Sequence, residues 1–260
     1  MTALERALRR DRALVALGIA AVLAPAWIYL TVASLDMYGA MSGPSAWMMR
    51  ATWDAAFAAL VFAMWAVMMA GMMLPSAAPA ILVYARVARS GEAPGRPVLR
   101  AYLFATGYLV VWTGFGLAAT GAQALLAAHA LVTPMMESAN RGLAAALLAL
   151  AGVYQWSAAK RACVRHCRGP AAFLSSHWRP GAAGALQMGL QHGLYCVGCC
   201  WALMLLLFAG GVMSLGWMAG LSLFVLLEKL SPFGVAGDRA TGALLLAAAA
   251  ALLGSSLVSG

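Results

Sequence analysis

The chain has 260 residues, of which 64% are hydrophobic and 10% are charged, and its formal net charge is +9. Soluble domains carry about 25% charged residues, so this composition excludes an ordinary soluble domain and indicates an integral membrane protein. The positive charge does not indicate nucleic-acid binding, because no basic stripe alternates with aromatic residues. Basic residues also gather in the cytoplasmic loops of membrane proteins.

Seven stretches are apolar enough to cross a bilayer, which takes about 20 mostly apolar residues. In chain order they are residues 13–34, 54–74, 101–128, 140–160, 183–208, 212–230 and 241–258. Pro75 and Pro79 are expected to end or kink the second span, with Ile81 to Arg89 following as a short surface helix. The predicted fold is an all-α, polytopic transmembrane helix bundle of about seven spans, forming one membrane domain over residues 1–260.

The basic residues predict how the chain is oriented. If the N-terminus is cytoplasmic, every lysine and arginine except Arg50 and Arg141 falls in a cytoplasmic segment. The positive-inside rule therefore predicts a cytoplasmic N-terminus and an external C-terminus. The first apolar stretch is too long for the hydrophobic region of a signal peptide, so it is interpreted as an uncleaved span.

The second span is unusually rich in methionine. Four of these residues form two pairs one helical turn apart, namely Met68, Met69, Met72 and Met73. Thioether sulfur is a soft ligand suited to Cu(I). Methionine at helical spacing also fills protein cores, so packing is the alternative interpretation. These residues are expected at a depth similar to that of His192 in the fifth span.

A thiol pair, Cys163 and Cys167, follows the fourth span at its predicted cytoplasmic end, with His166 adjacent. Basic surroundings favour thiolates. The pair is therefore expected to serve metal uptake or release, at a depth different from that of the fifth span. His129 and His177 are interpreted as solitary loop histidines.

The fifth span carries His192, Cys196, Cys199 and Cys200, at positions i, i+4, i+7 and i+8, which share one face of a helix. Ionisable groups within a membrane are costly and mark functional sites. Thiolate and imidazole are ligands for soft and borderline metals. The chain has five cysteines, an odd number, and three of them cluster here. Both facts favour metal or redox chemistry over a disulfide framework. Packing of cysteine as a small apolar residue is the alternative.

Glu228 and Lys229 end the sixth span. The Glu228 carboxylate is expected to pair with Lys229 or an arginine at the membrane interface. A counter-charge or proton relay near the inner opening is the alternative.

These motifs occur in a characteristic order. They are Met68-Met-x-x-Met-Met-Leu-Pro-Ser-Ala-x-Pro79, then Tyr154-Gln155 through Lys160 and Cys163 to Arg168, then His192-Gly-x-Tyr-Cys-x-Gly-Cys-Cys-Trp-Ala-Leu-Met204, and Trp217-Met218 through Glu228-Lys229. From about Met64 to Gly237 the chain resembles the bacterial family of predicted metal-binding integral membrane proteins designated domain of unknown function 2182. The resemblance implies a multi-pass protein of the bacterial inner (cytoplasmic) membrane that binds metal, and it implies no particular reaction.

The favoured function is Cu(I) handling, transport or delivery through an intramembrane site. The primary ligands are expected to be His192, Cys196, Cys199 and Cys200, followed by Met68, Met69, Met72 and Met73, with Cys163 and Cys167 as the uptake or release pair. Copper is the expected metal, and zinc and haem remain alternatives.

Two other classes of function stay open: a membrane-embedded metalloenzyme or redox enzyme, and a structural subunit of a larger membrane complex. The expected partners are the lipid bilayer and a metallochaperone or larger membrane complex, and no nucleic acid. The sequence has no phosphate-binding loop, so transport driven by ATP through this chain alone is not expected.

Overall fold

The computed structural model describes residues 3–39, 41–43, 46, 48, 53–90, 96–230 and 234–258. Helices dominate these ranges, and the all-α prediction is confirmed there. The helices are α1 (Ala3–Met37), α3 (Ala55–Ser90), α4 (Pro97–Ala128), α5 (Arg141–Gln155), α6 (Ala158–Arg168), α7 (Pro170–His177), α8 (Gly181–Leu205), α9 (Leu207–Gly210), α10 (Leu215–Leu230) and α11 (Gly234–Val258).

Within the described residues, five helical segments are long and apolar enough to cross a membrane. They are α1, α3, α4, the continuous stretch of α8 and α9, and α11. The pair α5 and α6 adds a sixth span if it is counted as one segment, bent by 69°. Helix α10 has 16 residues, short of the 20 or so that a span needs. The structure thus supports five or six membrane-length segments, and the count of seven and the orientation stay predictions.

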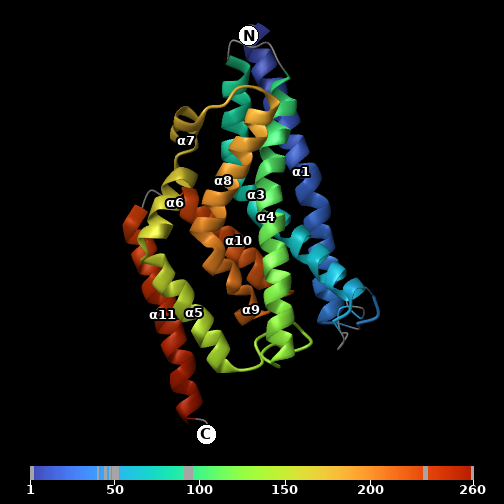
Figure 1. Ribbon diagram of the computed structural model, residues 1–260, viewed down its shortest axis with the longest axis vertical. Helices are drawn as coiled ribbons and strands as arrows, with labels where there is room; N and C mark the ends of the chain where they lie inside the picture. The colour runs from blue at the N-terminus through green and yellow to red at the C-terminus, as the bar shows by residue number, and fades with distance from the viewer. Residues whose placement is uncertain are drawn as a thin grey trace.

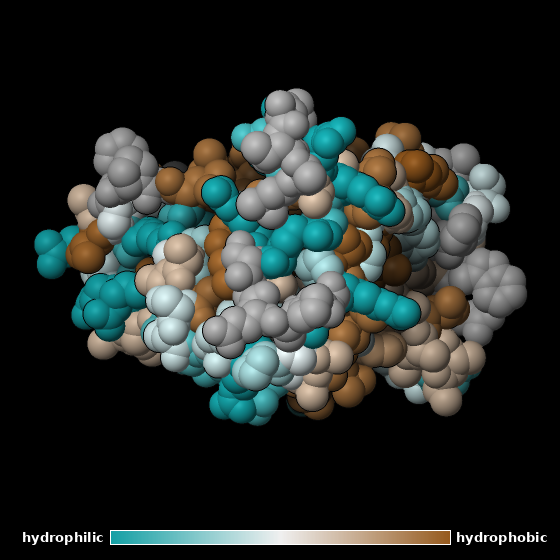
Figure 2. All heavy atoms as spheres, turned by 90° about the horizontal axis from the view of Figure 1, so that it is seen from above, coloured by the Kyte–Doolittle hydropathy of each residue, from teal (hydrophilic) through white to brown (hydrophobic). Residues whose placement is uncertain are grey.

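The helices form an elongated bundle in which α1 begins at one end and α11 ends at the other (Figure 1). Helix α4 packs between α3 and α8, α1 lies along α3, and α11 pairs with α5. Figure 2 looks onto the end where α1 begins, and hydrophilic side chains gather in the middle of that face. Such a polar end is expected where a bundle leaves hydrocarbon for water.

Two glycines allow α4 and α8 to approach closely. A Cβ at Gly189 would collide with the carbonyl of Phe104, and one at Gly107 would collide with the carbonyl of Leu186. Small residues let membrane helices pack backbone to backbone. This contact sets the position of the fifth predicted span, which carries the cysteine cluster, against α4.

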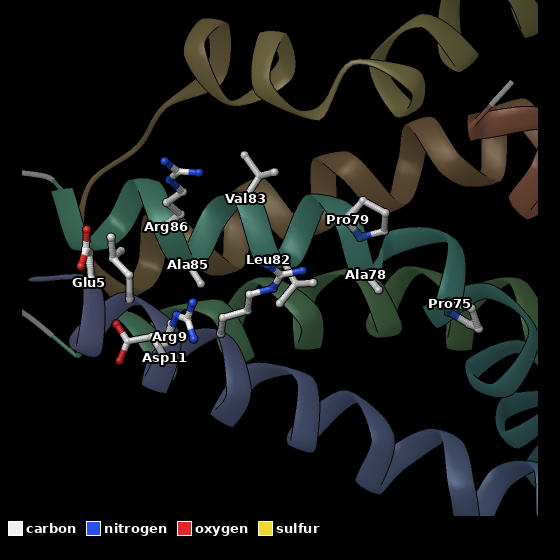
Figure 3. A pocket seen from close by; sticks show the side chains of 12 residues that line it. Glu5, Arg9, Asp11, Pro75, Ala78, Pro79, Leu82, Val83, Ala85 and Arg86 are labelled. Carbon is white, nitrogen blue, oxygen red and sulfur yellow. The ribbon is translucent and has the colours of Figure 1, made fainter. Parts of the chain in front are cut away.

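Helix α3 continues through both of its prolines, and residues 81–89 belong to it. Their expected position as a short surface helix is wrong, because Ile81, Tyr84 and Ala85 are buried. Figure 3 shows the ribbon changing direction close to Pro75, and the helix runs on to Ser90. Proline lacks the N–H that would bond the carbonyl four residues earlier, here Gly71. The indole Nε1 of Trp27 in α1 donates to that carbonyl at 3.1 Å. Because a neighbouring helix satisfies the freed group, Pro75 is tolerated within the span.

Candidate metal centre

Three thiols of α8 form a compact, solvent-inaccessible group. The Sγ atoms of Cys196, Cys199 and Cys200 all lie within 4.8 Å of one another. Two sulfurs bound to one ion lie up to about 4.6 Å apart, because a metal–thiolate bond is about 2.3 Å long. Small side-chain adjustments would therefore let these thiols share an ion. The thiols of Cys199 and Cys200 currently donate to the Cys196 carbonyl, at 3.1 and 2.9 Å.

The thiols of α6 lie against this group, so the expected separation in depth is wrong. The Sγ atoms of Cys167 and Cys199 are 3.9 Å apart. Cys163 occupies the space that a side chain at position 198 would need, since a Cβ on Gly198 would lie 2.6 Å from its Sγ. The cause is the sharp bend between α5 and α6, which lays α6 along α8. All five cysteines are free thiols.

Lys229 is a site residue that the sequence interpretation missed. Its Nζ lies 2.9 Å from the Cys196 Sγ and 2.8 Å from the Ser76 Oγ, and the residue is 5% exposed. The Tyr108 hydroxyl approaches the same sulfur at 3.0 Å and also donates to the Met73 carbonyl. A thiolate at Cys196 would therefore have an ammonium in direct contact, and removal of one partner of such a buried pair is costly.

The Glu228 carboxylate pairs with neither of its predicted partners, Lys229 or an arginine. Neighbouring residues on a helix face different directions, and Glu228 accepts from Lys160 of α6 at 2.7 Å instead. The guanidinium of Arg168 donates to the Glu228 carbonyl at 2.9 Å and to Asp238 at 2.8 Å. Both cations belong to α6, so these buried contacts fix the helix that presents Cys163 and Cys167. The spacing of a helix would have signalled that Glu228 and Lys229 diverge.

His192 lies one turn before Cys196 but outside the compact group of three thiols. Its imidazole is 1% exposed and packs among the rings of Phe104, Tyr108 and Phe173, with centroids 5.7, 5.9 and 5.1 Å away. The buried Nδ1 has no hydrogen-bond partner in the structure. Buried polar atoms without partners are uncommon, so this nitrogen suits a metal. Ligation by His192 stays a prediction.

The four predicted methionine ligands are wholly buried in α3: Met68, Met69, Met72 and Met73. Main-chain contacts join this segment to the centre, because the Met73 carbonyl accepts from Tyr108 and the Met72 carbonyl accepts from Ser222 of α10. Through Tyr108, which also contacts the Cys196 sulfur, this part of α3 lies next to the thiol group. Coordination by its thioethers stays a prediction.

A pocket of about 730 Å³ lies between α1 and α3. Figure 3 shows charged side chains, among them Arg9 and Arg86, toward one end and Pro75 at the other. None of the predicted ligands lines this pocket. The candidate centre therefore lies in the packed interior of the bundle and not in this opening.

Residues 62–252 match the family model PpoB2, which is described as a copper chaperone. The chain belongs to the PpoB2 family. No curated protein and no solved structure matches it. The PpoB2 match includes all five cysteines, His192 and the four methionines, whereas α1 lies outside it. A copper-related family is thus confirmed, and the designation domain of unknown function 2182 stays a prediction.

Proposed function

We propose that the protein binds Cu(I) between its transmembrane helices and hands it to another protein. The observation that carries the proposal is the buried group of Cys196, Cys199 and Cys200, with the Lys229 ammonium against one sulfur. The PpoB2 copper-chaperone match supports the choice of metal and of delivery. In this proposal the copper ion is cargo, and the chain itself performs no covalent chemistry.

Charge and softness both favour Cu(I) at this position. Thiolate and thioether are soft ligands that select Cu(I). A cuprous ion held by two thiolates carries one net negative charge, and the single ammonium of Lys229 balances it. Burial of an uncompensated charge would be strongly unfavourable. The Lys229 contact therefore lets an anionic copper–thiolate complex reside among apolar helices.

The remaining predicted ligands take supporting roles in this proposal. His192 contributes an imidazole from the previous turn of α8, and the methionines of α3 line the route. Cys163 and Cys167 receive or release the ion, because Cys167 lies 3.9 Å from Cys199 and can exchange it by a short step. We place the protein in the bacterial inner membrane, with a cytoplasmic N-terminus and seven spans. The receiving partner is a metallochaperone or a larger membrane complex.

Elemental analysis of detergent-purified protein after Cu(I) loading tests the proposal. We expect about one tightly held copper per chain, and its loss in Cys196→Ser. His192→Ala should also lose the copper. His129→Ala is the control and should keep it, because His129 is an exposed residue after the end of α4. Zinc alone, or no metal after copper loading, would refute the proposal.

A further inference from the structure

Two histidines outside the thiol centre face each other across the turn between α6 and α7. The ring centroids of His166 and His177 are 5.9 Å apart, and the rings meet edge to face at 73°. Both side chains are partly exposed. The sequence interpretation treated His177 as solitary, but the close succession of α6 and α7 brings it to His166.

The two imidazoles have the same hydrogen-bond arrangement. The Nδ1 of His166 lies 2.9 Å from the Ala162 carbonyl, and the Nδ1 of His177 lies 3.1 Å from the Phe173 carbonyl. A carbonyl only accepts, so these contacts place the proton on Nδ1 and leave a lone pair on Nε2. Metal-ligating histidines are oriented in this way by a carbonyl on the other nitrogen. The Ser176 hydroxyl, 2.8 Å from the His177 Nδ1, adds to this support.

Aromatic stacking holds both rings in place. His166 lies on Tyr195 with a centroid distance of 4.0 Å and an interplanar angle of 3°. His177 stacks on Phe173 at 4.9 Å and 22°. Fixed rings lose little freedom when they bind an ion, and such preorganisation favours binding.

We propose that His166 and His177 form a second, more exposed copper site, which passes Cu(I) to or from the thiol centre. A two-imidazole complex with opposed nitrogens holds its ring centres about 6 Å apart, because each metal–nitrogen bond is about 2 Å long and each nitrogen lies about 1 Å from its ring centre. The observed centroid distance of 5.9 Å matches this span, and binding requires the inclined rings to turn until both Nε2 atoms point at the ion. This inference rests on the proposed copper function.

The pair stands beside the route to the buried thiols. His166 precedes Cys167 on α6, and Tyr195, on which it stacks, precedes Cys196 on α8. Phe173 contacts the rings of both His177 and His192. Transfer along this route exchanges imidazole lone pairs for thiolate sulfur, and the copper stays Cu(I) with no electron moved. Neutral imidazoles in a basic segment hold a cation more weakly than thiolates do, so the thiol centre is the tighter site.

The chain has four histidines, so histidine-selective ¹⁵N labelling gives a spectrum simple enough to test the site directly. Cu(I) is titrated into the full-length protein under reducing conditions, with copper–thiolate absorption recorded in parallel. We expect the His166 and His177 signals to move together, with His129 unchanged as the internal control. Copper–thiolate absorption with both signals unmoved would overturn the histidine site alone. Moving signals without that absorption would instead refute the proposed thiol function.

Loading kinetics provide a second test. The double variant His166→Ala/His177→Ala should load the thiol centre at least about tenfold more slowly, because loss of such metal contacts typically costs 10- to 100-fold. Its final copper content should equal that of the His129→Ala control. His166→Gln/His177→Gln retains polar side chains and replaces the alanine variant if the latter fails to fold. Wild-type loading rates in a folded variant would overturn the inference.

Discussion

Replacement of Lys229 by leucine, which has no metal-binding atom, tests whether a buried ammonium compensates the charge of bound copper. The Nζ lies 2.9 Å from the Cys196 Sγ, and the lysine is buried at the end of α10. Two unit charges about 4 Å apart attract by about 4 kcal/mol at an effective dielectric constant near 20. That energy corresponds to a factor of about 1000 in affinity. Leucine also removes the cost of burying the ammonium, so we expect a net loss of about 100-fold.

Competition with a chromophoric Cu(I) chelator measures this affinity in detergent-solubilised protein. Lys229→Arg keeps the positive charge and should retain most of the binding, although its larger head displaces the Ser76 contact. Thermal unfolding of both variants verifies that each is folded. If Lys229→Leu binds Cu(I) as tightly as the wild type, the ammonium does not compensate the copper complex and the reasoning fails.

Two further predictions concern packing and pH. Gly198→Ala should lower the unfolding free energy by about 1–3 kcal/mol, because the new methyl group overlaps Cys163. Thermal unfolding measures this change. Gly216→Ala is the control, because a Cβ there meets nothing within 4 Å. Burial, followed by a hydrogen bond from Tyr38 to Glu137, raises the pKa of the Tyr38 hydroxyl to about 12. Because the folded-state pKa exceeds the usual 10, the stabilising contribution of this contact is complete below pH 10 and disappears as pH rises toward 12. Ultraviolet titration should show that Glu137→Gln lowers this pKa, and an unchanged titration would contradict the assignment.

Local periodicity was sufficient to predict the core of the centre. Because α8 is a regular helix, the spacing of Cys196, Cys199 and Cys200 alone places their sulfurs on one face. Hydropathy likewise located the helices, since a bilayer demands long apolar stretches. Residue spacing does not identify a metal, because soft donors of this kind suit more than one.

Contacts between distant segments explain what the sequence did not predict. The bend that lays α6 on α8 depends on the bonds of Lys160 and Arg168 to Glu228, which lies on α10. The continuation of α3 past Pro75 depends on Trp27, from a helix that the family match does not include. The spacing of residues within one helix does not predict its contacts with other helices, because those contacts depend on how the whole bundle packs.

The adjacent charges at the end of α10 have a mechanical consequence. Glu228 accepts a hydrogen bond from Lys160 of α6, and Lys229, the next residue, contacts the sulfur of Cys196 on α8. A rotation of α10 about its axis must therefore displace the Glu228–Lys160 contact and the Lys229 ammonium together. The position of the α6 thiols and the electrostatic environment of the Cys196 sulfur on α8 therefore both depend on the orientation of one helix, α10.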